Sequence, residues 1–169
     1  LLNHAGVSAA TSGFPTQRNP KYNLIEAEKI TEEKYVTGYN NFYEFSLDKE
    51  DVKDKAKHWK TEPWSIEISG MVQKPSTLDV NELINEFGIE QRVYRFRCVE
   101  AWSMIVPWDG FPLRKLIEKA QPLSSAKYIK FISFDDPEEA PGMKNRSYPW
   151  PYTEGLRMDE ALHELTLMV

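Results

Sequence analysis

The stretch 92–112, with the sequence RVYRFRCVEAWSMIVPWDGFP, constrains the fold of this chain more than any other segment. Up to the chain's only cysteine the residues alternate, which predicts a strand with two distinct faces. The predicted aromatic face carries Tyr94, Phe96, Cys98 and Glu100, and the opposite face carries Val93, Arg95, Arg97 and Val99. A carboxylate among apolar neighbours is costly unless it is paired or protonated. Packing alone therefore does not account for the thiol of Cys98 and the carboxylate of Glu100 on one side of this strand, and we predict a functional role for this pair.

Cys98 by itself leaves its own role open. A lone cysteine commonly acts as a small buried hydrophobe. A nucleophilic thiol would need a histidine base, and the three histidines, His4, His58 and His163, are all distant in sequence. The two neighbouring arginines would favour a thiolate, but strand geometry points them to the opposite face. A soft metal that takes a single protein thiolate fits the sequence as well.

The composition fits one globular domain of 169 residues, with 41% hydrophobic and 28% charged residues. The formal net charge of −5 argues against nucleic acid as a partner. No run approaches the roughly 18 apolar residues that a membrane span requires. A single cysteine excludes an internal disulfide and a cysteine-rich zinc site. The 11 prolines and the many aromatic residues favour a sheet-rich, loop-rich fold over a helical bundle.

Residues 1–37 are predicted to form an extended N-terminal segment ahead of a main domain over 38–169. Residues 1–13 are small and weakly apolar, which fits a frayed terminus or the remainder of a removed leader. After this segment, Asn40 and Asn41 lie among aromatic residues in the sequence TGYNNFYEFSLD. Paired asparagines of this kind form either a packed turn or amide hydrogen bonds to a polar ligand held against aromatic walls.

Apolar residues at helical spacing predict helices over 48–61, 80–87, 112–120 and 158–163. Asp79 and Glu82 form a capping pattern at the start of the second helix, and Gly88 ends it. Alternating residues predict further strands over 64–70, 127–134 and 165–169. The acidic segment 135–142 is predicted to be a loop. The elements together predict an α+β fold.

Three segments of the chain resemble a known family. They are GYNNFYEF at 38–45, RCVEAWSMIVPWDGFPL at 97–113 and PYTEGLRMDEAL at 151–162. These segments are similar to the N-terminal portion of the catalytic subunits of periplasmic protein-methionine-sulfoxide reductases, which are molybdopterin enzymes of the sulfite oxidase superfamily. The resemblance implies a sulfite-oxidase-like molybdopterin-binding domain with an irregular β-rich core and short helices. Because the family's domain continues past the position of Val169, we expect the domain to be truncated at the C-terminus.

The same resemblance implies which residues form the site. Cys98 would supply the thiolate that binds molybdenum, whose other soft ligands come from a single molybdopterin. The residues that correspond to cofactor-binding positions are Asn40, Tyr43, Glu44, Cys98 and Ser133, of which the last replaces a threonine common in the family. The residues that correspond to catalytic positions near the metal are Cys98, Glu100 and Asn41.

The activity that the resemblance implies is reduction of methionine sulfoxide in periplasmic proteins by oxygen-atom transfer. A membrane haem-containing subunit would donate the electrons, and a twin-arginine leader, not present in this sequence, would direct export. A related oxotransferase acting on small S- or N-oxides or on sulfite is an alternative, although the carboxylate of Glu100 argues mildly against an anionic substrate. The alternative from another class is a cofactor-free binding module in which Cys98 is an inert core residue.

Overall fold

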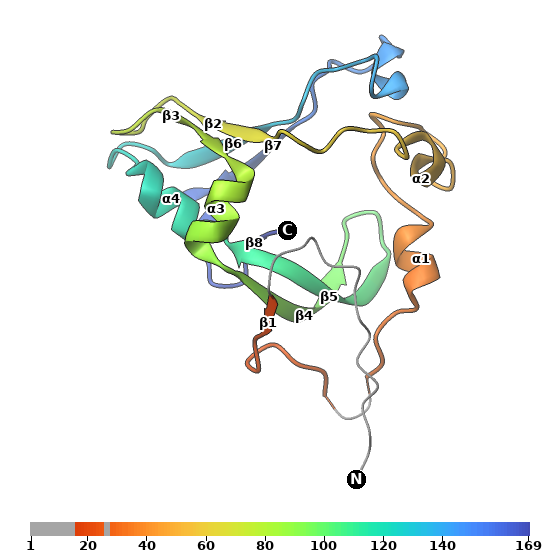
Figure 1. Cartoon of the computed structure of the whole chain (residues 1–169), viewed down its shortest axis with the longest axis horizontal. Helices are drawn as coiled ribbons and strands as arrows, with labels where there is room; N and C mark the ends of the chain where they lie inside the picture. Colours follow the sequence, from red (N-terminus) through yellow and green to blue (C-terminus); the bar gives the residue numbers. More distant parts are fainter. Residues whose placement is uncertain (1–15, 26–27) are drawn as a thin grey trace.

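The computed structural model describes residues 16–25 and 28–169, and the predictions for 1–13 lie outside this range. The elements in chain order are β1 (Thr16–Arg18), α1 (Glu33–Thr37), α2 (Val52–Lys55), β2 (Ser65–Ile68), β3 (Ser76–Asp79), α3 (Val80–Phe87), β4 (Ile89–Arg97), β5 (Ser103–Pro112), α4 (Leu113–Ala120), β6 (Tyr128–Ile132), the 3-10 helix η1 (Pro141–Lys144), β7 (Thr153–Arg157), α5 (Met158–Ala161) and β8 (Leu167–Met168). Short helices combined with several small sheets confirm the predicted α+β, β-rich fold (Figure 1).

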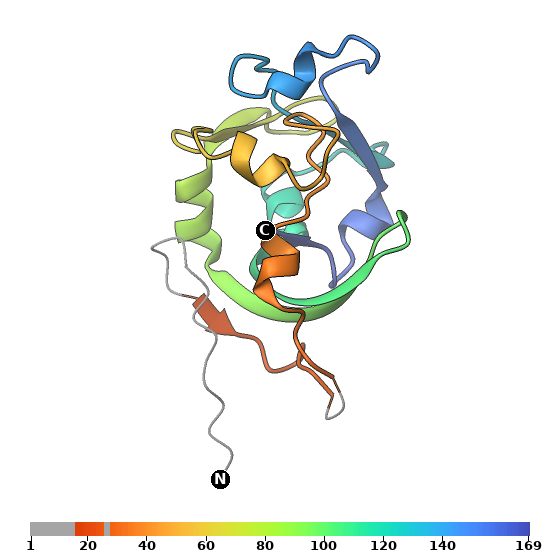
Figure 2. The ribbon, with the colours of Figure 1, turned by 90° about the vertical axis from the view of Figure 1, so that its right-hand side faces the viewer.

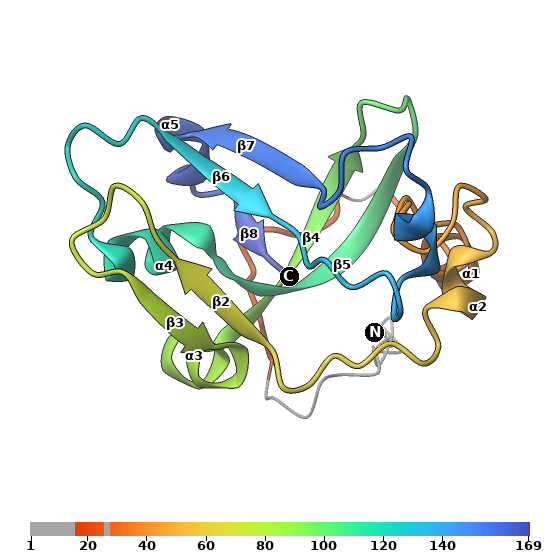
Figure 3. The same cartoon turned by 90° about the horizontal axis from the view of Figure 1, so that it is seen from above.

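The largest sheet has the strand order β1-β4-β5-β8 and is built around a long antiparallel hairpin. In this hairpin β4 and β5 pair from Glu90↔Gly110 to Arg97↔Ser103. β1 runs parallel to β4, and β8 adds two residues to the end of β5. β2 pairs with β3, and β6 pairs with β7, in two separate antiparallel pairs. In Figures 1 and 3 these two pairs lie with α3 and α4 at one end of the molecule, whereas the tip of the β4–β5 hairpin lies at the other end with α1 and α2.

Of the two longest helices, α3 has the predicted bounds and α4 begins one residue later than predicted, with Pro112 at its N-cap. The Asp79 side chain accepts a hydrogen bond of 3.0 Å from the backbone N–H of Glu82, which caps α3. Gly88 ends α3 with a φ of +70°, a conformation that glycine adopts without a Cβ penalty. The buried side chains of α4 are the four at helical spacing, Leu113, Leu116, Ile117 and Ala120. Local capping and apolar spacing therefore suffice to define these helices.

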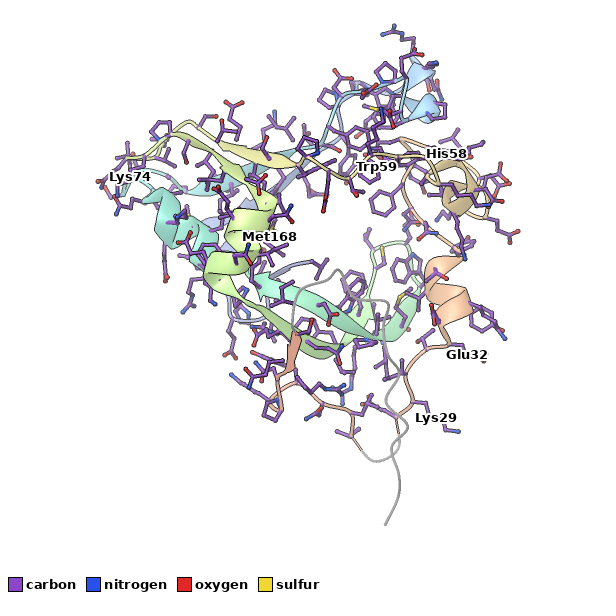
Figure 4. All side chains as sticks on the ribbon, in the orientation of Figure 1. Lys29, Glu32, His58, Trp59, Lys74 and Met168 are labelled. Carbon is purple, nitrogen blue, oxygen red and sulfur yellow. The ribbon has the colours of Figure 1, made fainter. Side chains whose placement is uncertain are left out.

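The helix predicted over 48–61 is wrong in length, because α2 covers only Val52–Lys55. Its predicted apolar side is correct, since Val52 is buried and both Ala56 and Trp59 pack into the same cluster. Trp59 reaches that cluster from a turn, with its ring 5.4 Å from the ring of Phe45 and 5.0 Å from that of Phe134 (Figure 4). So short a helix has little stability of its own, and tertiary packing of these side chains decides where it ends.

The sequence did not predict several elements, among them α1, β1, β3, η1 and β7, and η1 begins inside the segment 135–142 that was predicted to be a loop. The helix α1 falls within the segment 14–37, which the sequence suggested to be extended. The strand β7 falls where the sequence suggested only an approach to a helix, because Leu156 is its one half-buried residue and no alternation is visible. Pairing with β6 supplies the hydrogen bonds that hold it. The domain boundary at residue 38 stays a prediction, and within the described part of the chain no helix is long and apolar enough to cross a bilayer.

Two hydrophobic clusters lie at opposite ends of the molecule. The first is made by α3, α4, α5 and the end of β5, and its buried members are Leu83, Phe111, Leu113, Leu116, Ile117 and Ala161. The second joins the segment around Phe45 to α2 and η1, and its buried members are Phe45, Val52, Ala140 and Met143. In Figure 2 the curved β4–β5 hairpin passes along one side of the molecule, with α2 and η1 on the side opposite. The second cluster therefore fixes the segment that carries the predicted asparagine pair.

Candidate functional site

Cys98 lies in the tight turn that joins β4 to β5. β4 ends at Arg97, and the backbone carbonyl of Cys98 accepts a hydrogen bond of 3.1 Å from the N–H of Ala101. Ala101 adopts a left-handed φ of +66°, and the N–H of Cys98 donates to the carbonyl of Trp102 at 3.0 Å. The prediction that Glu100 follows Cys98 along one strand face is therefore wrong, because the chain has already turned. The two side chains share a turn, and Cys98 is half-buried.

The Glu100 carboxylate binds two residues that come from a distant part of the chain. The hydroxyl of Tyr43 donates a hydrogen bond of 2.9 Å to Oε1, and the ammonium of Lys49 donates to Oε2. The pKa of Glu100 lies below its usual value, chiefly because of the hydrogen bond from Lys49 and next because of the one from Tyr43. The carboxylate is thus paired and ionised, which removes the cost that the sequence raised.

The two asparagines have different environments. Asn40 closes its own loop: its backbone N–H donates to the carbonyl of Lys49 at 3.0 Å, and its amide donates to the carbonyl of Thr37 at 3.2 Å. The Asn41 side chain is the weakest of the causes that lower the pKa of Glu100. The Oδ1 atom of Asn41 is buried and has no hydrogen-bond partner. Asn41 thus offers an acceptor that a bound donor would satisfy.

Glu44 and Ser133 are the two remaining residues predicted to bind the cofactor. Glu44 is buried, and its charge contributes to a raised pKa of Tyr152, for which the hydrogen bond with Glu154 is the main cause. The backbone N–H of Ser133 donates to the carbonyl of Tyr152 at 2.9 Å. The structure thus brings Asn41, Tyr43 and Glu100 together near Cys98, and it connects Ser133 to Tyr152 rather than to the Cys98 turn.

The residues present fit a molybdopterin-bound metal. Within 16–25 and 28–169, no group of three or more His, Cys, Asp or Glu side chains could hold a metal ion. A metal at Cys98 therefore needs soft ligands from outside the protein, and the dithiolene of molybdopterin is such a ligand. The buried Oδ1 of Asn41 accepts no hydrogen bond from the protein, and the pterin ring carries N–H groups that could donate one to it. The roles of the individual site residues stay predictions.

The sequence did not reveal Lys49, and it did not show how the aromatic side chains around the turn pack. Lys49 belongs to a charge-dense run that has the pattern of a solvated surface, and no local signal separates it from the other lysines. The rings of Trp102 and Trp108 each lie 5.7 Å from the ring of Phe96. Both indole N–H groups are buried without a hydrogen-bond partner. Only the tertiary contacts identify these residues.

An open cavity of about 530 Å³ lies beside η1, a volume within the range of small-molecule sites. Its lining includes Met143, Arg146, Tyr148 and Trp150, but none of the site residues predicted from the sequence. The neighbouring Gly142 packs so closely on the backbone of Tyr43 and Glu44 that η1 is in direct contact with the segment 40–44, which is predicted to bind the cofactor.

The comparison with known families agrees with this geometry. The family model described as the oxidoreductase molybdopterin binding domain matches residues 52–169, which is more than half of the chain. The match includes the Cys98 turn and Ser133, and it begins after the segment that carries Asn40 to Glu44. The chain belongs to this molybdopterin-binding family of the sulfite oxidase superfamily, and it is an oxidoreductase domain that uses a molybdenum–molybdopterin cofactor.

Proposed function

We propose that this protein reduces methionine sulfoxide in periplasmic proteins, with Cys98 as the thiolate ligand of molybdenum. The main support is the hydrogen bond from Tyr43 to Glu100, 57 residues away along the chain. This contact joins the GYNNFYEF segment to the RCVEAW turn, and these are two of the three segments in which the chain resembles protein-methionine-sulfoxide reductases. The resemblance thus involves residues that meet in the fold.

The reaction converts a sulfoxide, two electrons and two protons into a thioether and water. When bound, the cofactor supplies the two-electron oxygen-atom transfer. The chain's part is to hold the cofactor, to orient it and to deliver protons. Tyr43 and Lys49 both carry a proton and both donate to the Glu100 carboxylate, so this group of three is our candidate for proton delivery.

The charge at the site bears on the choice of substrate. The Glu100 carboxylate alone would disfavour an anion such as sulfite. The ion pair with Lys49 compensates this charge, so electrostatics exclude sulfite less firmly than the sequence suggested. Small S- and N-oxides are neutral and fit the site equally well on this ground. Family membership argues against the cofactor-free binding module.

A membrane haem-containing electron donor and a periplasmic location belong to the same proposal. They rest on the resemblance to the reductase family. The net charge of −5 supports the absence of nucleic acid among the partners.

The test compares wild-type protein with Cys98→Ser, both purified as full chains from cells that make the cofactor. We expect stoichiometric molybdenum in the wild type and its loss in Cys98→Ser, with unchanged far-UV circular dichroism. With a reduced viologen as electron donor, the wild type should reduce methionine sulfoxide in an oxidised protein faster than it reduces dimethyl sulfoxide or trimethylamine N-oxide. Faster turnover of either small oxide, or oxidation of sulfite, would refute the proposed substrate. Retention of molybdenum by Cys98→Ser would refute the assignment of Cys98 as the metal ligand.

A further inference from the structure

Lys49 contacts several residues of the site at once. Its ammonium donates to Oε2 of Glu100 and lies 5.5 Å above the ring of Tyr39 and 5.9 Å above that of Tyr43. Its backbone carbonyl accepts the hydrogen bond of 3.0 Å from Asn40 that closes the loop 40–49. The Lys49 side chain is only 21% exposed. One residue therefore contacts both the cofactor-binding segment and the turn that carries the thiol.

The nearby lysines behave differently. Lys55 pairs with Asp51 and Lys57 with Asp54, which are partners four and three residues away on the surface, and Lys55 also donates to the hydroxyl of Ser46 at 3.2 Å. Exposed pairs of this kind contribute little to stability or geometry. The partner of Lys49, Glu100, is 51 residues away along the chain, and the side chains of both residues are at most one-third exposed. This ion pair is therefore a tertiary contact, not part of a solvated charged surface.

We propose that Lys49 is a positioning residue that binds Glu100 and thereby holds the Cys98 turn at a fixed spacing from the segment 40–44. Cys98 and Glu100 share one tight turn, so fixing the carboxylate restricts the thiol as well. The predicted cofactor ligands Tyr43 and Asn40 contact the same lysine through its ring-facing ammonium and its carbonyl. Partners that orient a metal ligand without touching the metal commonly matter for metal affinity. This inference depends on the proposed role of Cys98 as metal ligand.

The experiment compares Lys49→Met, Lys49→Arg and the control Lys57→Met, each as a full chain loaded with cofactor. Lys49→Met keeps the length of the side chain and removes its charge, and Lys57→Met removes an exposed ion pair in the same run. We expect Lys49→Met to lower the molybdenum retained after dialysis about tenfold, the lower end of the loss typical for such partners. The molybdenum EPR signal of the retained fraction should shift. Lys49→Arg should keep the molybdenum retention and the EPR signal of the wild type, and Lys57→Met should change neither the retention nor the signal.

A double variant tests whether Lys49 acts through Glu100. In a Glu100→Gln background, Lys49→Met should cause no further loss of molybdenum. Wild-type retention and spectrum in Lys49→Met, an equal effect of Lys57→Met, or an additive double variant would each overturn the proposal. If Cys98→Ser retains molybdenum, the metal-ligand assignment fails. If Cys98→Ser loses it while Lys49→Met does not, the positioning role alone fails. Neither readout depends on the substrate.

Discussion

Replacing Gly142 by alanine tests whether η1 holds in place the segment 40–44, which we predict to bind the cofactor. A Cβ at this position would lie 2.3 Å from the carbonyl oxygen of Tyr43 and 2.7 Å from that of Glu44. Ordinary contact begins at 3.4 Å, so one of the two backbones must move by about 1.1 Å. The φ of Gly142 is not in the left-handed region, so alanine adds no backbone strain of its own. The substitution therefore changes the distance between η1 and Tyr43.

The expected effects concern stability and activity separately. Overpacking of this kind costs about 1–3 kcal/mol of unfolding free energy. For a chain of this size, each kcal/mol lowers the melting temperature by about 2–4 °C. A displacement of about 1 Å in a group that positions the reacting centre costs about a hundredfold in turnover. Gly142→Ala should therefore lose much more activity than its modest loss of stability would explain.

The measurements are thermal unfolding, molybdenum content and sulfoxide reduction by the cofactor-loaded chain. Gly155→Ala in β7 is the matched control, because a Cβ there meets only the carbonyl oxygen of Ile129 at 3.8 Å, an ordinary contact. The control should change stability by less than about 1 kcal/mol and leave turnover at the wild-type level. Equal turnover in Gly142→Ala and Gly155→Ala would show that η1 does not position the segment.

Two further predictions concern the scaffold. Leu83 is 1% exposed in the cluster formed by α3 and α4, so Leu83→Ala should lower the free energy of unfolding by about 3 kcal/mol, measured by chemical denaturation. This cluster contains no site residue, so the molybdenum content should not change. A loss of molybdenum would contradict the separation of the two clusters. The guanidinium of Arg95, hydrogen-bonded to Glu28, holds the pKa of that carboxyl below its ordinary value of 4.5. The ion pair therefore stabilises the fold above about pH 4.5 and is lost as the pH falls through the lowered pKa. Glu28→Gln should show a smaller loss of stability on acidification than the wild type, and parallel curves would refute this.

The sequence predicted the elements whose determinants are local. The capping residue Asp79 and the left-handed Gly88 define α3, and apolar residues at helical spacing define the buried side of α4. The alternation ahead of Cys98 predicted β4 correctly, and the residues around this cysteine fit a metal site with a single protein thiolate. Each of these signals involves residues a few positions apart, and short-range sterics and hydrogen bonding act over that distance.

The site itself depended on contacts that no local pattern contains. The alternation extended the strand through Glu100, whereas the chain turns at Cys98 because Ala101 adopts a left-handed conformation. The partners of Glu100 lie 51 and 57 residues away, and the sequence alone could not select Lys49 from a run of similar lysines. The sequence by itself determined the secondary structure leading to the cysteine, whereas the role of its thiol as a metal ligand was implied only by the resemblance to the molybdopterin family. The tertiary structure alone decided which charges meet there, because that choice depends on packing between segments that are far apart in the chain.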